Sequence, residues 1–257
     1  MKYLIVCGSD RSKHKVALSI LKYFLNQHKK EKKDIFVCVL DKDKVICKLL
    51  TKKGVKFITK GIEKFLLNVE KDSFDWLLNI WGSIIYKKET LKKFKNNINL
   101  HPSYLPFAKG KDPYVWSIQS EYPLGVTIHE MNSQIDSGKY FIRKKILLDF
   151  PYNAGDVFDL SLKQCILEFK KNWLNILNKK IKKKKFLESK TKIYKRIDLI
   201  NDNILNLDKK ININLRKFFL KILSQDFNFN KLQIMYNKSI FDISLNIKKS
   251  KKKNWYK

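Results

Sequence analysis

Long apolar runs are absent from this sequence of 257 residues. A membrane-spanning helix needs about 18 consecutive apolar residues or more, and no stretch approaches that length. The first apolar run covers only residues 3–7 and ends at Gly8, whereas an export signal has a longer apolar core before its cleavage site. We therefore expect a soluble, cytoplasmic protein that does not bind a membrane.

Cysteine is scarce too, and its four positions show no C-x-x-C spacing. Cys7 and Cys38 lie within apolar, strand-like runs, where a free thiol behaves as a small hydrophobic side chain. The sequence thus predicts reduced, buried cysteines, and it favours neither disulfides nor a zinc site. We expect no metal in the functional site.

Arginine is rare: 4 arginines accompany 51 lysines, although the net charge is +31. A strongly basic chain suggests a polyanionic partner such as nucleic acid. Lysine neutralises phosphates, but it lacks the planar guanidinium that reads guanine edges. Asparagine is also abundant, at 21 residues, so we interpret the charge mainly as a compositional bias at solvated positions. The lysine runs at residues 179–185 and 248–253 are then a solvated helix end and a tail.

Glycine-rich phosphate loops are missing as well. A single glycine, Gly8, follows the first apolar run, so the G-x-G-x-x-G fingerprint of dinucleotide-binding folds is not present. No G-x-x-x-x-G-K-[ST] sequence occurs either. These absences argue against the standard nucleotide-cofactor sites.

The first half of the chain alternates between two patterns. Short apolar runs occur at residues 3–7, 35–40, 55–58 and 76–80. Amphipathic stretches follow them at residues 13–26, 45–52, 61–68 and 88–94. This order predicts a parallel sheet with helices on its faces, and nearly continuous apolar strands fit a sheet covered on both sides. The fold class we expect is α/β, with a Rossmann-like, mostly parallel sheet.

The second half predicts the rest of this domain and a small appendage. Strands are expected at residues 97–101, 125–131 and 139–148, and helices at 114–120 and 154–177. Gly155 or Asp156 is the expected cap of the longer helix. A helix at 215–223 and strands at 232–236 and 240–247 form a small C-terminal α+β unit. We expect domains at residues 1–180 and 181–257, the second for dimerisation or acceptor binding.

Asn99 and His101 are two residues apart on a predicted strand, so their side chains project from the same face. Pro102 ends the strand, which places the pair at its carboxyl end, where ligands bind in open α/β sheets. An amide and an imidazole aimed at one point can donate hydrogen bonds to a developing oxyanion, and the imidazole can exchange a proton. The alternative is that both side chains only tie down the following loop.

Asp136 heads a loop segment, Asp136-Ser137-Gly138, that also has two interpretations. Asp-Ser-Gly is ordinary turn chemistry. The functional interpretation is a carboxylate that orients His101 or moves a proton. Asn132-Ser133 and Asp202-Asn203 are comparable polar pairs that we interpret as turns only.

Five segments together resemble a known family. They are N-x-H-P-S-x-L-P at residues 99–106, Lys109-Gly110, Trp116-Ser117-Ile118, G-V-T-I-H at residues 125–129 and Ile135-Asp136-Ser137-Gly138. Each segment alone is common, but all of them in this order over about 40 residues make a specific signal. Over residues 1–180 the chain resembles the N10-formyltetrahydrofolate-dependent formyltransferases.

The resemblance implies a catalytic domain that uses N10-formyltetrahydrofolate as formyl donor. It implies catalytic roles for Asn99, His101 and Asp136. It also implies a folate pocket formed by Trp81, Gly82, Ser83, Ile84, Ile85 and Ile135. The acceptor contacts that we predict are Ser103, Tyr104, Lys109, Gly110, Tyr114 and His129.

The implied mechanism is attack of the acceptor amine on the formyl carbon. The Asn99 amide and a protonated His101 hold the oxyanion. Asp136 helps to maintain that protonation and, through water, takes the proton that the amine loses.

The family divides by acceptor. Residues 110–118, 125–130 and 194–199 look similar to nucleotide-sugar N-formyltransferases of surface-polysaccharide pathways, such as lipopolysaccharide biosynthesis. Methionyl-tRNA is the main alternative acceptor, because the net charge of +31 would favour a polyanion such as tRNA. The tRNA enzymes, however, carry a C-terminal β-barrel larger than the 77 residues after Lys180, and usually lack a histidine at the position of His129.

One further alternative is the purine-pathway ribonucleotide enzyme, but chains of that kind stop near the end of the core domain. The other is a non-catalytic, basic RNA-binding protein that retains the formyltransferase core domain. His129 contacts either the acceptor or a structural carboxylate. Tyr114 and Trp116 have two possible roles: stacking on a base or sugar of the acceptor, or packing in the hydrophobic core. For Trp116 we favour packing in the core. The partners we expect are a small-molecule nucleotide sugar, with tRNA as the alternative, and a second copy of the chain in a homodimer.

Overall fold

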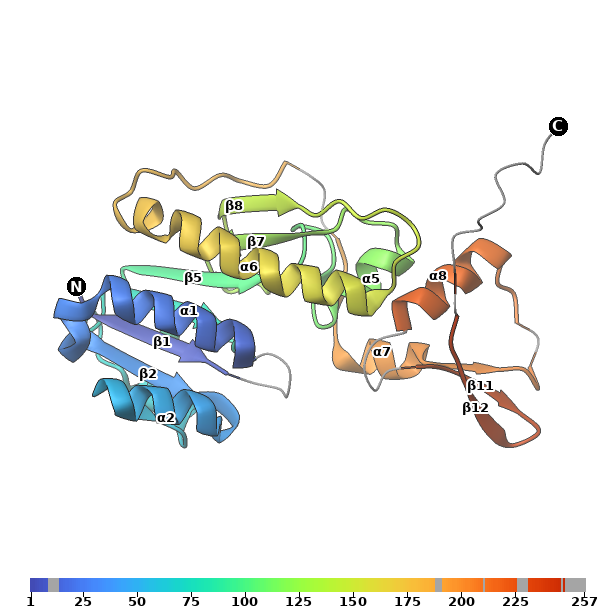
Figure 1. Ribbon diagram of the computed structural model, residues 1–257, viewed down its shortest axis with the longest axis horizontal. Helices are drawn as coiled ribbons and strands as arrows, with labels where there is room; N and C mark the ends of the chain where they lie inside the picture. The colour runs from blue at the N-terminus through green and yellow to red at the C-terminus, as the bar shows by residue number, and fades with distance from the viewer. Residues whose placement is uncertain (9–13, 188–190, 210, 226–230, 246, 248–257) are drawn as a thin grey trace.

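The computed structural model describes residues 1–8, 14–187, 191–209, 211–225, 231–245 and 247. Three sequence-based predictions reach beyond these residues: residue 13 of the first expected helix, residue 246 of the last expected strand and the lysine run at 248–253. The described chain runs from an N-terminal sheet-and-helix body to a smaller C-terminal part at the opposite end of the molecule (Figure 1).

A seven-stranded sheet forms the centre of this body, in the order β3-β2-β1-β4-β5-β7-β8. Its strands are β1 (Tyr3–Cys7), β2 (Ile35–Val39), β3 (Lys56–Ile58), β4 (Trp76–Ile80), β5 (Asn96–His101), β7 (Gly125–His129) and β8 (Tyr140–Lys145). Strands β1 to β5 run parallel, whereas β7 is antiparallel to β5 and β8 is antiparallel to β7. The predicted α/β class with a mostly parallel sheet is confirmed.

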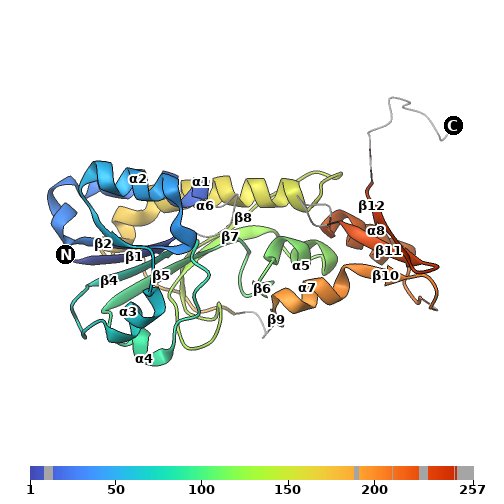
Figure 2. The same ribbon diagram turned by 90° about the horizontal axis from the view of Figure 1, so that it is seen from below.

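Helices cover both faces of the sheet (Figure 2). One face carries α1 (His14–Gln27), α2 (Lys44–Lys53) and α6 (Ala154–Leu177), and the other carries α3 (Ile62–Asn68) and α4 (Lys88–Leu91). Two 3-10 helices, η1 (Lys29–Asp34) and η2 (Leu40–Lys42), flank β2.

Strand β1 shows how one apolar run serves two cores. Tyr3, Ile5 and Cys7 are buried in the larger core with side chains of α1 and α6. Leu4 and Val6 are buried in the smaller core with side chains of α3 and α4. Because successive side chains of a strand point to opposite faces, a sheet covered on both sides requires a continuous apolar run.

The predicted cap of α6 is wrong. The cap is Asn153, whose side-chain oxygen accepts the Asp156 N–H at 3.0 Å, while the Asp156 carboxylate accepts the Asn153 N–H at 2.9 Å. In this capping box the predicted Asp156 is the third helical residue, and Gly155 is the second.

The remaining elements build the site region and the C-terminal unit. They are β6 (Lys109–Gly110), α5 (Pro113–Gln119), β9 (Ile193–Tyr194), α7 (Arg196–Asp202), β10 (Ile204–Asn206), α8 (Leu215–Gln225), β11 (Leu232–Tyr236) and β12 (Ser239–Ile243). Strands β10, β11 and β12 form a separate sheet, and β9 returns to pair with β6. The small C-terminal α+β unit is therefore confirmed. Elements β6, β9, α7 and β10 were not predicted; β6 and β9, at two residues each, are too short for a periodic pattern.

Asp202 is more than the turn residue that we expected. It ends α7, and its carboxylate accepts hydrogen bonds from the amides of Gln119 at 2.7 Å and Gln225 at 3.1 Å. It also pairs with the Lys221 ammonium. The carboxylate thereby joins α5, α7 and α8.

The four cysteines are free thiols, and Cys7, Cys38 and Cys165 are buried. Burial raises the pKa of the Cys38 thiol to about 12, so this group stays protonated at neutral pH. Among the described helices, none combines the length and the apolar character needed to cross a bilayer.

We expect Asn153→Ala to lower the free energy of unfolding by about 1 kcal/mol, because it removes the side-chain acceptor at the start of α6. Urea denaturation followed by tryptophan fluorescence measures the change. Asn175→Ala, at an exposed position of the same helix, is the matched control and should be neutral or slightly stabilising, since alanine has the higher helix propensity. Equal stability of Asn153→Ala and wild type would contradict the capping role.

Candidate active site

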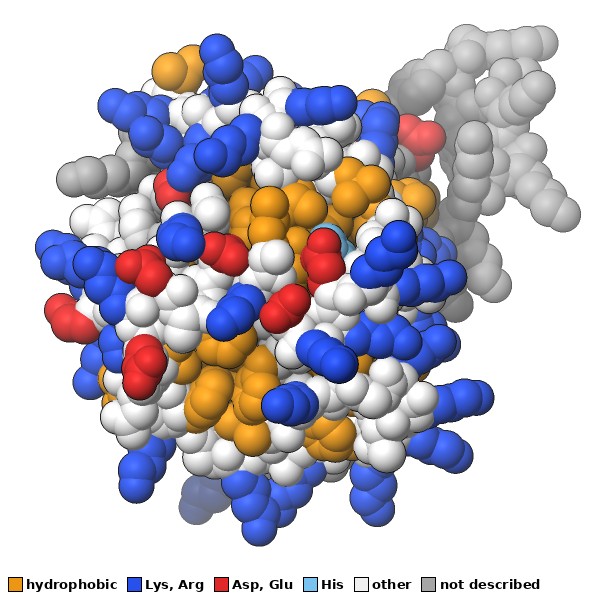
Figure 3. Space-filling model, turned by 90° about the vertical axis from the view of Figure 1, so that its left-hand side faces the viewer, with side chains coloured by type: hydrophobic (Ala, Val, Ile, Leu, Met, Phe, Trp, Pro, Cys, Tyr) orange, Lys and Arg blue, Asp and Glu red, His pale blue; other side chains and the backbone are white. Residues whose placement is uncertain are grey.

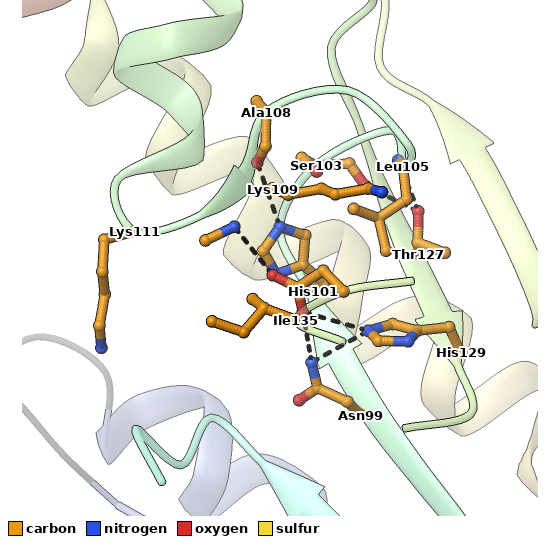
Figure 4. Close-up of polar contacts among 12 residues, drawn as sticks. Asn99, His101, Ser103, Leu105, Ala108, Lys109, Lys111, Thr127, His129 and Ile135 are labelled. Carbon is orange, nitrogen blue, oxygen red and sulfur yellow. Dashed lines mark hydrogen bonds and ion pairs between the residues drawn. The ribbon is translucent and has the colours of Figure 1, made fainter. Parts of the chain in front are cut away.

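Two neighbouring strands bring polar side chains to one place. Asn99 and His101 are two residues apart on β5 and share a face of the sheet. His129 lies on β7 directly opposite Asn99, and residues opposite each other in an antiparallel pair place their side chains on the same face. The Asn99 Nδ2 and His129 Nε2 atoms are 3.1 Å apart (Figure 4).

The Asp136 carboxylate faces all of these side chains. Its Oδ1 lies 3.4 Å from Asn99 Nδ2 and 3.5 Å from His129 Nε2. Its Oδ2 accepts the Gly110 N–H at 2.9 Å and lies 3.5 Å from His101 Nδ1. The side chain is only 10% exposed. The loop that carries Asp136 thus brings a buried charge to the end of β5.

Opposing effects set the protonation of this group. Burial alone raises the pKa of Asp136, but His101, His129 and the Gly110 N–H stabilise the carboxylate, and its pKa lies well below the usual value. Burial also lowers the pKa of His101, and it prevails over the nearby Asp136 charge, which raises that pKa. These directions favour a carboxylate at Asp136 and a neutral ring at His101. Burial thus opposes the protonated His101 on which the mechanism expected from the sequence relies.

A cavity of about 410 Å³ lies beside these groups, and Asn99, His101 and Asp136 form part of its wall. All the residues predicted for the folate pocket also line it, namely Trp81, Gly82, Ser83, Ile84, Ile85 and Ile135. Of the predicted acceptor contacts, Gly110, Tyr114 and His129 lie on the wall.

The other three predicted acceptor contacts are engaged elsewhere. The Ser103 hydroxyl donates to the carbonyl of Phe107 at 2.8 Å, within its own loop. The Tyr104 ring stacks under the Arg143 guanidinium, whose carbon lies 3.6 Å from the ring centre. The buried Lys109 ammonium donates to Ser137 Oγ at 3.1 Å. These side chains support the loops around the site instead of lining the cavity.

The surroundings of His129 and Trp116 distinguish between the two roles that the sequence left open for each. His129 is 1% exposed, and its contacts with Asp136 and Asn99 fit the structural-carboxylate interpretation. Trp116 is buried and stacks on Tyr194, with ring centres 4.3 Å apart and planes 8° apart. The packing interpretation that we favoured for Trp116 is confirmed.

Sequence reasoning missed two residues and one segment of the site. The Asn79 amide, on β4, donates to Asn99 Oδ1 at 2.8 Å, and the Tyr86 hydroxyl donates to Asn79 Oδ1 at 3.1 Å. An asparagine within the apolar run at 76–80 was the available signal. Residues 193–196 also line the cavity, and only the family resemblance of residues 194–199 hinted at a role.

The family model for formyl transferases matches residues 28–164, which is more than half of the chain. The chain belongs to the formyl transferase family. This membership confirms the resemblance that the five sequence segments carried.

Curated members of the family match parts of the chain. The dTDP-4-amino-4,6-dideoxyglucose formyltransferase of Mycobacterium bovis is 33% identical over 61 residues, which cover 24% of this chain and 26% of the relative. The methionyl-tRNA formyltransferase of Mycoplasma mycoides is 28% identical over 153 residues, which cover 57% of this chain and 45% of the relative. The chain thus spans between a quarter and a half of the length of these relatives.

Solved formyl transferases share the fold over nearly the whole chain. A sugar N-formyltransferase from Shewanella has a TM-score of 0.76 at 19% identity, covering 98% of this chain and 99% of that chain. An N-formyltransferase from Helicobacter canadensis, solved with folinic acid and dTDP-3-aminofucose, has a TM-score of 0.72 at 22% identity, covering 93% and 85%. At these identities the likeness establishes the fold.

We expect an NMR titration to give His101 a pKa below 6.5, because burial disfavours the charged ring. Asp136→Asn should lower the pKa of His101 further, since the carboxylate charge raises it in the wild type. The lowered pKa of His101 also makes the free energy of unfolding depend on pH. Between the pKa of His101 in the folded protein and about 6.5, the unfolded chain binds a proton that folded His101 does not, so the free energy of unfolding decreases as pH falls through this range. An unchanged or raised His101 pKa in Asp136→Asn would contradict the assigned contact.

Proposed function

We propose that this protein transfers the formyl group of N10-formyltetrahydrofolate to the amine of a nucleotide-linked amino sugar. The observation that carries the proposal is the meeting of Asn99, His101 and Asp136 on the wall of one cavity. Membership of the formyl transferase family supports the reaction class. The matches with the mycobacterial sugar enzyme and the Helicobacter structure support the acceptor and donor classes.

The cavity wall beside Asn99 suits a flat donor that is partly apolar. Residues 81–85 lie outside helix and strand, so their peptide groups are not committed to a regular ladder and can hydrogen-bond to a pterin ring. Ile84 and Ile85 add an apolar surface, and Ile85 is 74% exposed at the cavity. A bound aromatic ring would remove this apolar surface from water.

Each of the three central side chains has a defined task in the proposed transfer. As the amine nitrogen bonds to the formyl carbon, the Asn99 amide donates to the oxygen that becomes negative. The neutral His101 accepts on Nδ1 the proton that the amine loses, because Nε2 faces the Ala108 carbonyl at 3.4 Å. Asp136, 3.5 Å from Nδ1, stabilises the resulting imidazolium. His101 then returns the proton to the nitrogen that leaves when its bond to the formyl carbon breaks. A neutral resting imidazole is the form that this sequence needs.

Another part of the cavity wall suits a nucleotide sugar. Lys111, Lys195 and Arg196 line the cavity, and although Arg196 pairs with Asp112 at 3.1 Å, the lysines leave an excess of positive charge that favours a diphosphate. Two of these three side chains come from the C-terminal unit. The acceptor wall is therefore built partly by residues outside the family match at 28–164.

A methionyl-tRNA acceptor and a non-catalytic RNA-binding role have less support. The described C-terminal part holds a three-stranded sheet with two helices in place of a β-barrel domain. On the face shown in Figure 3, lysine and arginine side chains are spread around the surface with acidic side chains among them. Nucleic-acid sites instead concentrate basic side chains on one stripe or patch.

We further propose that the protein acts as a homodimer in the cytoplasm, with a catalytic domain at residues 1–180 and a C-terminal domain at 181–257. Free thiols fit a reducing compartment. Strand β12 forms an edge of the C-terminal sheet, and Tyr236, Ile240 and Phe241 on β11 and β12 are each more than half exposed. An exposed edge with large apolar side chains is a surface that a second copy can cover.

We expect Asn99→Ala, His101→Ala and Asp136→Ala each to lower turnover by about 100-fold or more, because Asn99 donates to the oxyanion, His101 carries the proton and Asp136 stabilises the charged ring. The assay incubates the protein with N10-formyltetrahydrofolate and either a panel of amino-sugar nucleotides or methionyl-tRNA, and mass spectrometry detects the added formyl group. Asn175→Ala is the control and should retain full activity. Formylation of methionyl-tRNA but of no sugar nucleotide would contradict the proposed acceptor.

We expect sedimentation equilibrium to give the wild type a mass of twice the 30.6 kDa chain. The double variant Ile240→Lys, Phe241→Lys should sediment as a monomer, because buried lysines without partners oppose association. Leu147→Lys, at an exposed apolar position after β8, is the control and should remain dimeric. A monomeric wild type at micromolar concentration would contradict the dimer.

A further inference from the structure

A row of three polar side chains crosses the centre of the sheet. Asn79 on β4 is in register with Asn99 on β5, and Asn99 is in register with His129 on β7. Asn79 is 4% exposed and stands in a strand whose other four residues are buried and apolar. A buried amide at this position needs hydrogen-bond partners, and all of its contacts lead toward the active site.

The contacts of Asn79 link the cavity wall to Asn99. The Asn79 Nδ2 atom donates to Asn99 Oδ1 at 2.8 Å and to the carbonyl of Gly82 at 3.1 Å. The Tyr86 hydroxyl donates to Asn79 Oδ1 at 3.1 Å. Gly82 packs so closely that a Cβ atom there would lie 2.3 Å from Asn79 Oδ1. The amide is thus held on both sides.

The direction of this chain of amides is fixed at both ends. A side-chain amide can turn its oxygen and nitrogen ends around, so its partners decide which end points where. The Gly82 carbonyl only accepts, which turns the Asn79 NH2 toward it and toward Asn99 Oδ1. The Asp136 carboxylate also only accepts, and it faces the Asn99 NH2. Both ends require the same orientation of Asn99.

We infer that Asn79 is a positioning residue that keeps the NH2 end of Asn99 turned toward the reacting oxygen. The inference rests on the proposed formyl transfer, in which the Asn99 amide must donate to the oxyanion. With its own oxygen occupied by Asn79, Asn99 presents its donor end to the cavity. Without Asn79, only the longer 3.4 Å contact with Asp136 still favours this orientation, so the reversed orientation, which presents an oxygen to a developing negative charge, becomes more populated.

The first test is the kinetics of Asn79→Leu, a substitution of similar size that removes all three side-chain hydrogen bonds of Asn79. We expect kcat to fall about 10- to 100-fold, because misplacing one catalytic group costs this much, while KM for the donor stays within about threefold. Asn175→Ala is the control with unchanged kcat. Unchanged kcat in Asn79→Leu would overturn the inference.

A double-mutant cycle separates positioning from a general structural role. If Asn79 acts through Asn99, then adding Asn79→Leu to Asn99→Ala should change kcat by less than about twofold, because the group to be positioned is already gone. A structural role would repeat the full loss in the Asn99→Ala background, and this result would overturn the inference.

A neutron structure of the wild-type protein tests the same point without any activity. Deuterium atoms on Asn99 should lie on the end that faces Asp136, and those on Asn79 should point to Asn99 and Gly82. The reverse arrangement would overturn the inference even if the variants fail to fold. A wild type that transfers no formyl group to any acceptor would instead contradict the proposed function, and the neutron result would still decide the orientation.

Discussion

The buried charge of Asp136 is the constraint on which the reaction centre depends. A carboxylate that is mostly removed from water is tolerated only when hydrogen-bond donors and positive groups surround it. Here the donors and rings come from three separate strands: Asn99 and His101 from β5, His129 from β7 and Gly110 from β6. Loss of any one of them would leave the charge less compensated, so the carboxylate holds three strands to a single geometry.

The geometry around Asp136 requires glycine at two positions of the family segments, Gly110 and Gly138. Gly110 has φ near +90°, and a Cβ atom there would lie 2.1 Å from the carbonyl oxygen of Tyr194. A side chain would therefore push β9 away and move the N–H that Asp136 accepts. A Cβ atom on Gly138 would lie 1.8 Å from the carbonyl oxygen of Glu130, so the turn after Asp136 can close only with glycine. The D-x-G segment is both a turn and the support of a buried charge.

The sequence predicted those features that depend on local periodicity. The short continuous apolar run at residues 3–7 is typical of a buried strand, the run at 154–177 has the period of its helix, and the spacing of Asn99 and His101 placed them on one face. Contacts between residues far apart in the sequence could not be predicted from such local patterns. Ser103 and Lys109 belong to the family segments, yet the positions of Phe107 and Ser137 decide that they turn away from the cavity.

The same limit explains why the burial of His101 was not foreseen and why Asn79 was missed. The composition of a strand end does not reveal that an imidazole will be buried enough for its pKa to fall, because that burial depends on long-range contacts such as those of His101 with Ala108 and Asp136. The polar residue in the run at 76–80 was visible, but its meaning depends on the register between β4 and β5, which the sequence alone does not fix.

The two walls of the cavity differ in how they are held. The wall that we assign to the donor follows β4 in the middle of the sheet, whereas residues 193–196 on the acceptor side reach the core through the two-residue pairing of β6 with β9. That pairing includes the Lys111 N–H donated to the Tyr194 carbonyl at 2.9 Å, next to Gly110, whose N–H binds Asp136. The segment at residues 193–196 is therefore bonded to the residue next to the one that binds the central carboxylate. In the proposed enzyme, the short strand β6 links the placement of the acceptor wall to the placement of Asp136, and precise placement of a catalytic group is what the chemical step requires.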